Sequence, residues 1–315
     1  MTDARAALPR SPISIGRVIT AILVIVAVTV TVAALPKWTG LTSILWPILI
    51  VVCHRYPTAG LALLAFTIPF QDEVWIETII GHSTVTRYVG WALIAAWLPL
   101  LADGRRVIVD RVAVMHVLVI ITLVTSLAAG GVRLYTWFIE IYHWLLPLAV
   151  YIVCRSLCFT TRDRLWVVAG IAAGVIVAST AGFRQLITGA GPESYQVGGL
   201  VRIFGTFGHP NTLAAFLVLA LPVMLAVSVL WPRPAPALAI WTIRAGSLIG
   251  TLALFLTQSR GGWLAFAGAV GVLLILSPRA VQRASAAVVL AAILLFVASG
   301  VATEVPGLSR FSSVI

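Results

Sequence analysis

The stretch "NTLAAFLVLALPVMLAVSVL", residues 211–230, decides the fold class, because it runs through twenty residues without a charged side chain. About 20 helical residues cross the roughly 30 Å hydrocarbon core of a bilayer. Ten further apolar runs lie on either side of it, near 17–35, 41–53, 58–70, 84–101, 112–129, 137–155, 165–187, 241–257, 261–277 and 285–301. The chain of 315 residues is 61% hydrophobic and 10% charged. It therefore predicts one all-α polytopic membrane domain over 1–315, with about 10–11 transmembrane helices.

The connections between the runs predict the orientation of the chain in the lipid bilayer. "HRYP" at 54–57 separates two short runs, as a tight turn in a re-entrant pair or as a loop between two full spans. Most of the 21 Lys and Arg residues fall in alternate connections, and cytoplasmic connections collect such residues. We therefore expect a cytoplasmic N-terminus. The net charge of +11 then reflects membrane topology, and we expect no nucleic-acid partner.

Some basic residues fall on the opposite, outer side in this topology: Lys37, Arg87, Arg133, Arg184, Arg202, Arg260 and Arg310. Arg202 and Arg260 each stand shortly before a run that starts at the outer face. A helix N-terminus has unsatisfied N–H groups and a partial positive charge, so it favours an anion. Guanidinium groups bind phosphate oxygens in a bidentate manner. The pattern favours an outward phosphate or pyrophosphate site, and the alternative is two tight loops whose arginines touch lipid headgroups.

The residues around both arginines suit the starts of helices. In "GHPNTLAAF" we expect Asn211 to be the N-cap, after Pro210 has stiffened the approach. In "LTQSRGGWLAF" we expect Ser259 to be the N-cap, while Gly261 and Gly262 allow a neighbour or a ligand to come close to the backbone.

The segment "RIFGTFGHPNTLAAFL" at 202–217, followed by "TQSRGGWLAF" at 257–266, resembles the paired signature of the O-antigen ligase and O-antigen polymerase family of bacterial membrane glycosyltransferases. The core of this resemblance spans about 200–277. It implies a GT-C-like transferase at the outer face of the bacterial cytoplasmic membrane, without metal or cofactor. The donor would be a glycan on undecaprenyl pyrophosphate, and the acceptor a hydroxyl of a glycolipid or another glycan, or of a protein in some relatives.

The same resemblance implies roles for individual residues. Arg202 and Arg260 match family positions that bind the donor pyrophosphate. By position, His209, Asn211, Ser259 and Gly261 would support the same site.

One part of the family pattern is missing from this sequence. Family members have a large outer loop after the run that matches 285–301, with a histidine proposed as general base or substrate ligand. This chain ends at Ile315, where that loop should begin, so we expect a fragment, an incomplete gene model or a decayed copy. Within the chain, Glu140 and His143 are weaker candidates for the catalytic base, because they lie one helical turn apart within a span.

A second class of function fits the many spans and the outward arginines. A transporter or flippase-like carrier of an anionic or lipid-linked solute would also need them. Carriers concentrate charge near the middle of the membrane, at broken helices, whereas Arg202 and Arg260 lie at the ends of spans. The sequence therefore favours the transferase.

Overall fold

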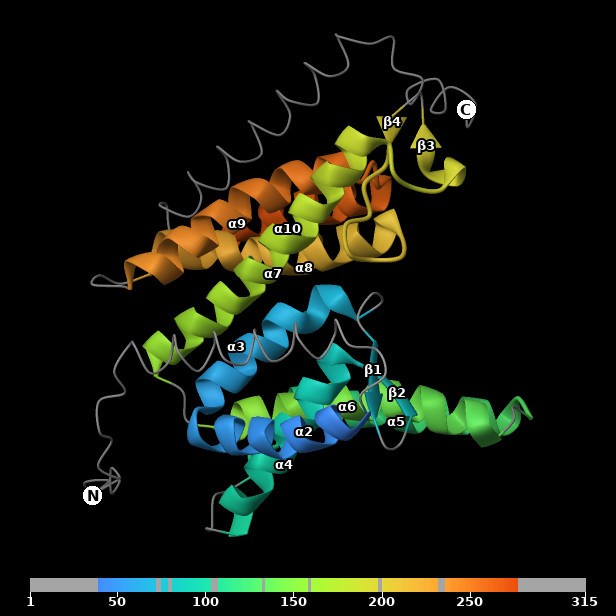
Figure 1. Ribbon diagram of the computed structural model, residues 1–315, viewed down its shortest axis with the longest axis vertical. Helices are drawn as coiled ribbons and strands as arrows, with labels where there is room; N and C mark the ends of the chain where they lie inside the picture. Colours follow the sequence, from blue (N-terminus) through green and yellow to red (C-terminus); the bar gives the residue numbers. More distant parts are fainter. Residues whose placement is uncertain are drawn as a thin grey trace. The chain divides into compact units, whose positions relative to one another are not determined.

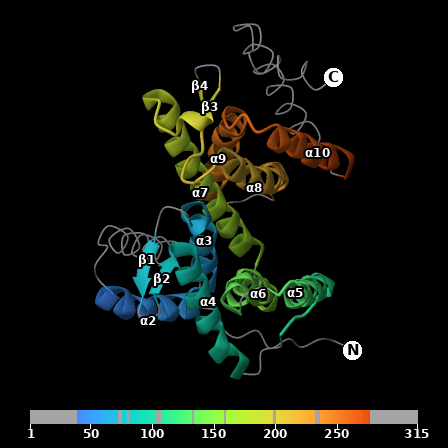
Figure 2. The ribbon, with the colours of Figure 1, turned by 90° about the vertical axis from the view of Figure 1, so that its right-hand side faces the viewer.

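The structure is a computed structural model that describes residues 39–71, 75–78, 81–102, 107–131, 134–157, 160–197, 200–231 and 236–276. These residues are almost entirely helical, with two small two-stranded sheets, β1–β2 and β3–β4 (Figures 1 and 2). The predicted spans at 17–35 and 285–301, and the outer residues Lys37, Arg133 and Arg310, lie outside the described residues. The all-α prediction is confirmed for the part of the chain described.

Every predicted span within the described ranges forms a helix with bounds close to those expected. The helices are α2 (Thr39–Arg55), α3 (Pro57–Thr67), α4 (Val85–Ala102), α5 (Arg111–Ala129), α6 (Leu134–Ser156), α7 (Thr161–Thr188), α8 (Pro210–Leu230), α9 (Ala237–Leu256) and α10 (Arg260–Leu276). Between them lie two 3₁₀ turns, η1 (Ile68–Phe70) and η2 (Glu193–Tyr195), and the strands β1 (Trp75–Thr78), β2 (Gly81–Thr84), β3 (Gln196–Val197) and β4 (Leu200–Val201).

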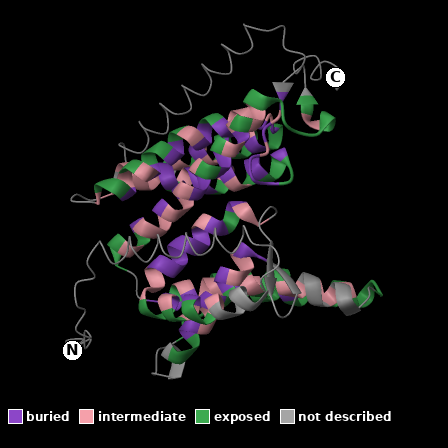
Figure 3. Ribbon diagram, viewed as in Figure 1, coloured by how far each residue is buried: buried purple, intermediate pink, exposed green. Residues whose placement is uncertain are grey.

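Four of the described helices are long and apolar enough to cross a membrane: α5, α7, α9 and residues Pro210–Val229 of α8. Shorter apolar helices accompany them. Large apolar side chains such as Met115, Leu118 and Ile121 of α5 are exposed. Figure 3 shows exposed residues along several of the helices. Exposed apolar surface of this extent is costly in water and favourable in lipid. The described helices thus indicate association with a membrane.

The described residues form two compact units. The described residues of the first unit lie within Met1–Leu63, Ile76–His82 and Tyr88–Ser156. Here "HRYP" is a tight turn, because Tyr56 alone separates α2 from α3. A Cβ on Gly60 would lie 2.8 Å from Sγ of Cys53, which is 1% exposed. Because Gly60 has no side chain, the start of α3 can lie close to the end of α2.

Asp110 joins α5 to α6 in the first unit. Its Oδ1 accepts hydrogen bonds from the Val112 and Ala113 N–H groups at 3.1 Å and caps α5. The Tyr151 hydroxyl donates to Oδ2 at 2.8 Å, and Nε of Arg155 donates to the same oxygen at 2.9 Å. These bonds hold the pKa of the Asp110 carboxyl below its usual range, and the bond from Tyr151 has the largest effect.

The low pKa of Asp110 predicts a pH dependence for the α5–α6 pair. A carboxyl whose pKa is lower in the folded state stabilises the fold above its unfolded pKa, and that contribution is lost as the pH falls through the folded value. We expect the pair to loosen in acid, and we expect Asp110→Asn to be less stable than the wild type at neutral pH and to show less of this acid dependence. Tryptophan fluorescence of both proteins during an acid titration in detergent measures the loosening of the pair. Identical acid transitions for the two proteins would contradict the assignment.

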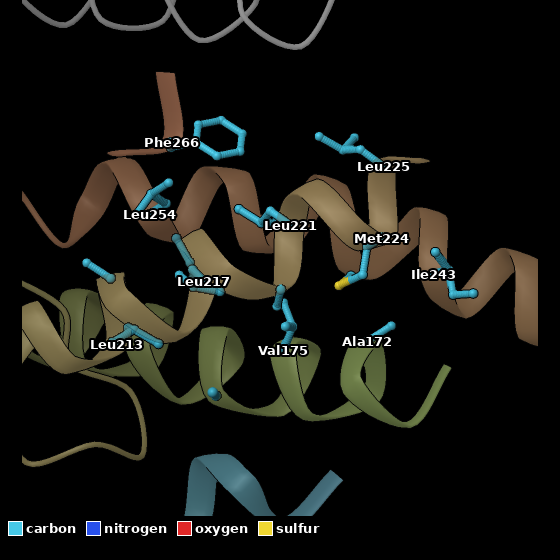
Figure 4. Close-up of a cluster of buried hydrophobic side chains, with 14 of the residues drawn as sticks. Ala172, Val175, Leu213, Leu217, Leu221, Met224, Leu225, Ile243, Leu254 and Phe266 are labelled. Atoms are coloured by element: carbon cyan, nitrogen blue, oxygen red, sulfur yellow. The ribbon is translucent and has the colours of Figure 1, made fainter. Parts of the chain in front are cut away.

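The described residues of the second unit lie within Leu64–Trp75, Ser83–Arg87 and Leu157–Ile315, and they include α7, α8, α9 and α10. Its core is formed by buried apolar side chains of these four helices (Figure 4), including Val175, Leu217, Leu221, Met224 and Ile243. Two glycines of α9 allow the close packing. A Cβ on Gly250 would lie 2.6 Å from Cγ1 of Val175, and one on Gly246 would lie 2.8 Å from Cε of Met224. This packing fixes the ends of the helices that carry the candidate site.

Candidate functional site

The two segments that resemble the family signature meet in the second unit. The Ile203 N–H donates to the Leu256 carbonyl at 3.2 Å, so the loop after β4 runs beside the end of α9. Nε of Arg202 donates to the carbonyl of Thr257 at 3.0 Å. Residues more than fifty positions apart in sequence therefore share one cluster.

The Arg202 guanidinium spans the two segments. Besides its bond to Thr257, its Nη2 donates to Oδ1 of Asn211 at 3.0 Å, in the first turn of α8. Arg202 is half-buried and Asn211 is exposed. Two acceptors on different elements fix both the position and the plane of the guanidinium, and a planar cation fixed in advance is well suited to bind an anion.

The start of α8 corrects one prediction. The N-cap is His209, not Asn211: Nδ1 of His209 accepts from the Asn211 N–H at 3.0 Å. The reason is Pro210, which has no N–H and whose fixed φ suits the first helical position, so the residue before it becomes the cap. Asn211 instead gives its side-chain oxygen to Arg202.

The start of α10 agrees with the sequence at Ser259. Its buried Oγ accepts from the Gly262 N–H at 3.3 Å, which is a capping bond. Arg260 is the first residue of α10 and is exposed. A Cβ on Gly262 would lie 2.9 Å from Cβ of Ala214, so this glycine allows α10 to approach α8. Gly261 has open space at the same position, so within the described part of the chain it serves no close packing.

Gln185, near the end of α7, holds the loop that carries Arg202, and the sequence did not single it out. Its Oε1 accepts from the Phe204 and Gly205 N–H groups at 3.1 and 2.9 Å, and its Nε2 donates to the Gly205 carbonyl at 2.7 Å. The Thr206 hydroxyl donates to the Pro69 carbonyl at 2.6 Å. The loop is thus held by side chains along its length.

Tyr195 of η2 is a second residue missed by sequence reasoning. Its ring contacts the rings of Phe204 and His209 edge to face, with centroids 5.5 and 5.3 Å apart. Its hydroxyl donates to the Gly208 carbonyl at 2.9 Å, and the Arg202 N–H donates to the Tyr195 carbonyl at 2.8 Å. No local sequence pattern predicts these contacts, because Tyr195 lies in a short connection without apolar periodicity.

The candidates for a catalytic base lie in the other unit. Glu140 and His143 belong to α6, as predicted. His143 is exposed, and its ring centroid is 6.2 Å from that of Tyr142. The side chain of Glu140 lies outside what the structure describes. Their pairing stays a prediction.

The electrostatics around Arg202 and Arg260 favour negative charge. Two helix N-termini, of α8 and α10, lie in this cluster, and each carries the partial positive charge of a helix start. The sequence has no Asp or Glu between Glu193 and Glu304, so no carboxylate of this stretch competes for the guanidinium groups. The arrangement is suited to an anionic group with several oxygens.

Comparison with protein-family models gave no match, and neither the curated proteins nor the solved structures yielded a similar chain.

Proposed function

We propose that this chain transfers a glycan from undecaprenyl pyrophosphate to an acceptor hydroxyl at the outer face of the bacterial cytoplasmic membrane, in the manner of O-antigen ligases and polymerases. The observation that carries the proposal is the Arg202 guanidinium, which bonds to Thr257 and to Asn211 at 3.0 Å each. It joins the two segments on which the resemblance rests.

The chemistry of transfer explains why such a cluster would be useful. The acceptor oxygen forms a bond to the anomeric carbon of the glycan, and the bond from that carbon to the phosphate oxygen breaks. The acceptor hydroxyl passes its proton to a general base, for which Glu140 and His143 are the candidates within this sequence. Negative charge grows on the departing pyrophosphate. Arg202, Arg260 and the partial positive charge at the starts of α8 and α10 would stabilise this charge without reorganising during the reaction.

The test is glycan transfer from a lipid pyrophosphate donor by membranes that contain the natural full-length protein. We expect Arg202→Ala and Arg260→Ala each to lower the transfer rate at least about tenfold, which corresponds to about 1.4 kcal/mol of transition-state stabilisation. Arg162→Ala is the matched control, because Arg162 is an exposed arginine in the first turn of α7. We expect it to retain normal transfer.

Two results would overturn the proposal. One is normal transfer by both arginine variants at equal membrane levels. The other is uptake or efflux of an anionic solute by reconstituted vesicles in the absence of any transferase activity, which would favour a carrier.

A further inference from the structure

His209 makes a hydrogen bond that exists only while its ring is neutral. The Asn211 backbone N–H is the donor at 3.0 Å, so Nδ1 of His209 must be the acceptor and carry no proton. The remaining ring proton of a neutral imidazole then resides on Nε2. This geometry fixes the tautomer of His209.

The other histidines whose bonds are described behave differently. Nδ1 of His54 faces the Ala96 carbonyl and Nε2 of His116 faces the Trp144 carbonyl, both at 3.0 Å. A carbonyl is an acceptor, so each ring nitrogen donates and the bond survives when the ring gains a second proton. Protonation therefore breaks the bond of His209 and preserves those of His54 and His116.

The bond of His209 connects directly to Arg202. The residue whose N–H it caps, Asn211, is the residue whose Oδ1 accepts from Nη2 of Arg202. Tyr195 stabilises the ring orientation, with centroids 5.3 Å apart and planes at 80°. The backbone carbonyl of His209 accepts from the Thr212 and Leu213 N–H groups at 3.1 and 3.2 Å, so His209 contacts the first turn of α8 through its backbone as well as its ring.

We propose that His209 is a pH-sensitive positioning residue: its neutral form caps α8 and, through Asn211, orients Arg202, and its protonated form releases both. Histidine is the residue type that changes charge between about pH 5 and pH 8. Only the use of Arg202 for the donor pyrophosphate rests on the proposed function. Charged and titratable groups on the elements around His209 are Arg184 of α7, Glu193 and Tyr195 of η2, Arg202 after β4, and Arg260 of α10.

The first test follows amide hydrogen exchange in residues 202–213 of the purified protein in nanodiscs, at about pH 5 and about pH 8. His209→Ser retains a capping oxygen that does not titrate, and His209→Ala has no cap. Comparing the proteins at one pH cancels the intrinsic pH dependence of exchange. At the higher pH we expect equal protection in the wild type and His209→Ser, and about fivefold faster exchange in His209→Ala. At the lower pH we expect the wild type to exchange like His209→Ala, while His209→Ser stays protected.

Two results would overturn the proposal. One is a ratio of the exchange rate in the wild type to that in His209→Ser that is the same at both pH values. The other is a ¹⁵N histidine spectrum at the higher pH with the proton of His209 on Nδ1. His54→Ser serves as the control for a general effect of acid. Because the His54 bond survives protonation, we expect exchange in residues 202–213 of this variant to match that of the wild type at both pH values.

A second measurement separates this inference from the proposed function. Binding of inorganic pyrophosphate is measured for the wild type and His209→Ser at the same two pH values. If the wild type binds pyrophosphate more weakly than His209→Ser at the lower pH, and equally well at the higher pH, the result supports both the inference and the proposed function. If exchange shows the switch and pyrophosphate binds neither protein, the coupling stands and the proposed function fails.

Discussion

Gly205→Ala is expected to unfold the loop that holds Arg202 and to lower the stability of the second unit by about 2–5 kcal/mol. Gly205 has φ of +61°, and a Cβ there would lie 2.5 Å from the carbonyl oxygen of Ala178. The left-handed conformation costs about 1–2 kcal/mol for a residue with a side chain. Overpacking adds about 1–3 kcal/mol, since the obstacle is helix backbone of α7 and cannot rotate away. Thermal unfolding of the purified protein in detergent measures the loss.

Gly189 provides the matched control. Its φ is +67°, and nothing lies within 4 Å of a Cβ at that position. Gly189→Ala therefore carries the conformational cost without the collision, and we expect it to lose about 1–2 kcal/mol. Equal losses for the two variants would show that the contact between Gly205 and Ala178 contributes nothing.

Gln185→Met should have an effect of comparable size, although Gln185 lies outside both segments of the signature. Methionine has nearly the same length but makes none of the three hydrogen bonds to Phe204 and Gly205. These backbone groups are part-buried. A buried polar group left without a partner costs about 1–3 kcal/mol, so we expect a total loss of about 3 kcal/mol or more. Pyrophosphate binding should fall with it, because Arg202 is on the same loop.

Gln185→Glu separates the two halves of this interaction. A carboxylate keeps the oxygen that accepts from Phe204 and Gly205, but it replaces the amide donor that faces the Gly205 carbonyl. We expect a stability between those of the wild type and Gln185→Met. If Gln185→Met unfolds at the wild-type temperature, the loop is held by other contacts and the role assigned to Gln185 is wrong.

The helices could be predicted from the sequence to within a few residues. Each long apolar run is bounded by polar or turn-forming residues, and length and composition suffice to identify a helix that lipid can surround. The N-cap of α8 was assigned to Asn211 although the signal for His209 was present. A proline in the first turn marks the first helical position, and hence the residue before it as the cap.

The internal support of the site could not be predicted. Gln185, Tyr195 and Thr257 bind the Arg202 loop through contacts that no periodicity encodes. In each of these hydrogen bonds at least one of the two groups is a backbone group, which every residue carries, and the two residues lie up to 55 positions apart. The arginines themselves were visible because charge is rare in this chain, whereas a glutamine or a tyrosine at the end of a helix attracts no notice until the loop is seen to fold against it.

The bond between Arg202 and Thr257 also dictates an order of biogenesis. Chain synthesis proceeds at about 5–20 residues per second, so the 55 residues between donor and acceptor separate their appearance by roughly 3–11 s. In that interval α8 has been made while the guanidinium still lacks Thr257. The cluster is completed only after α9 has been synthesised, and a ribosome that stalls between residues 231 and 256 would leave every helix up to α8 synthesised and the guanidinium without its bond to Thr257.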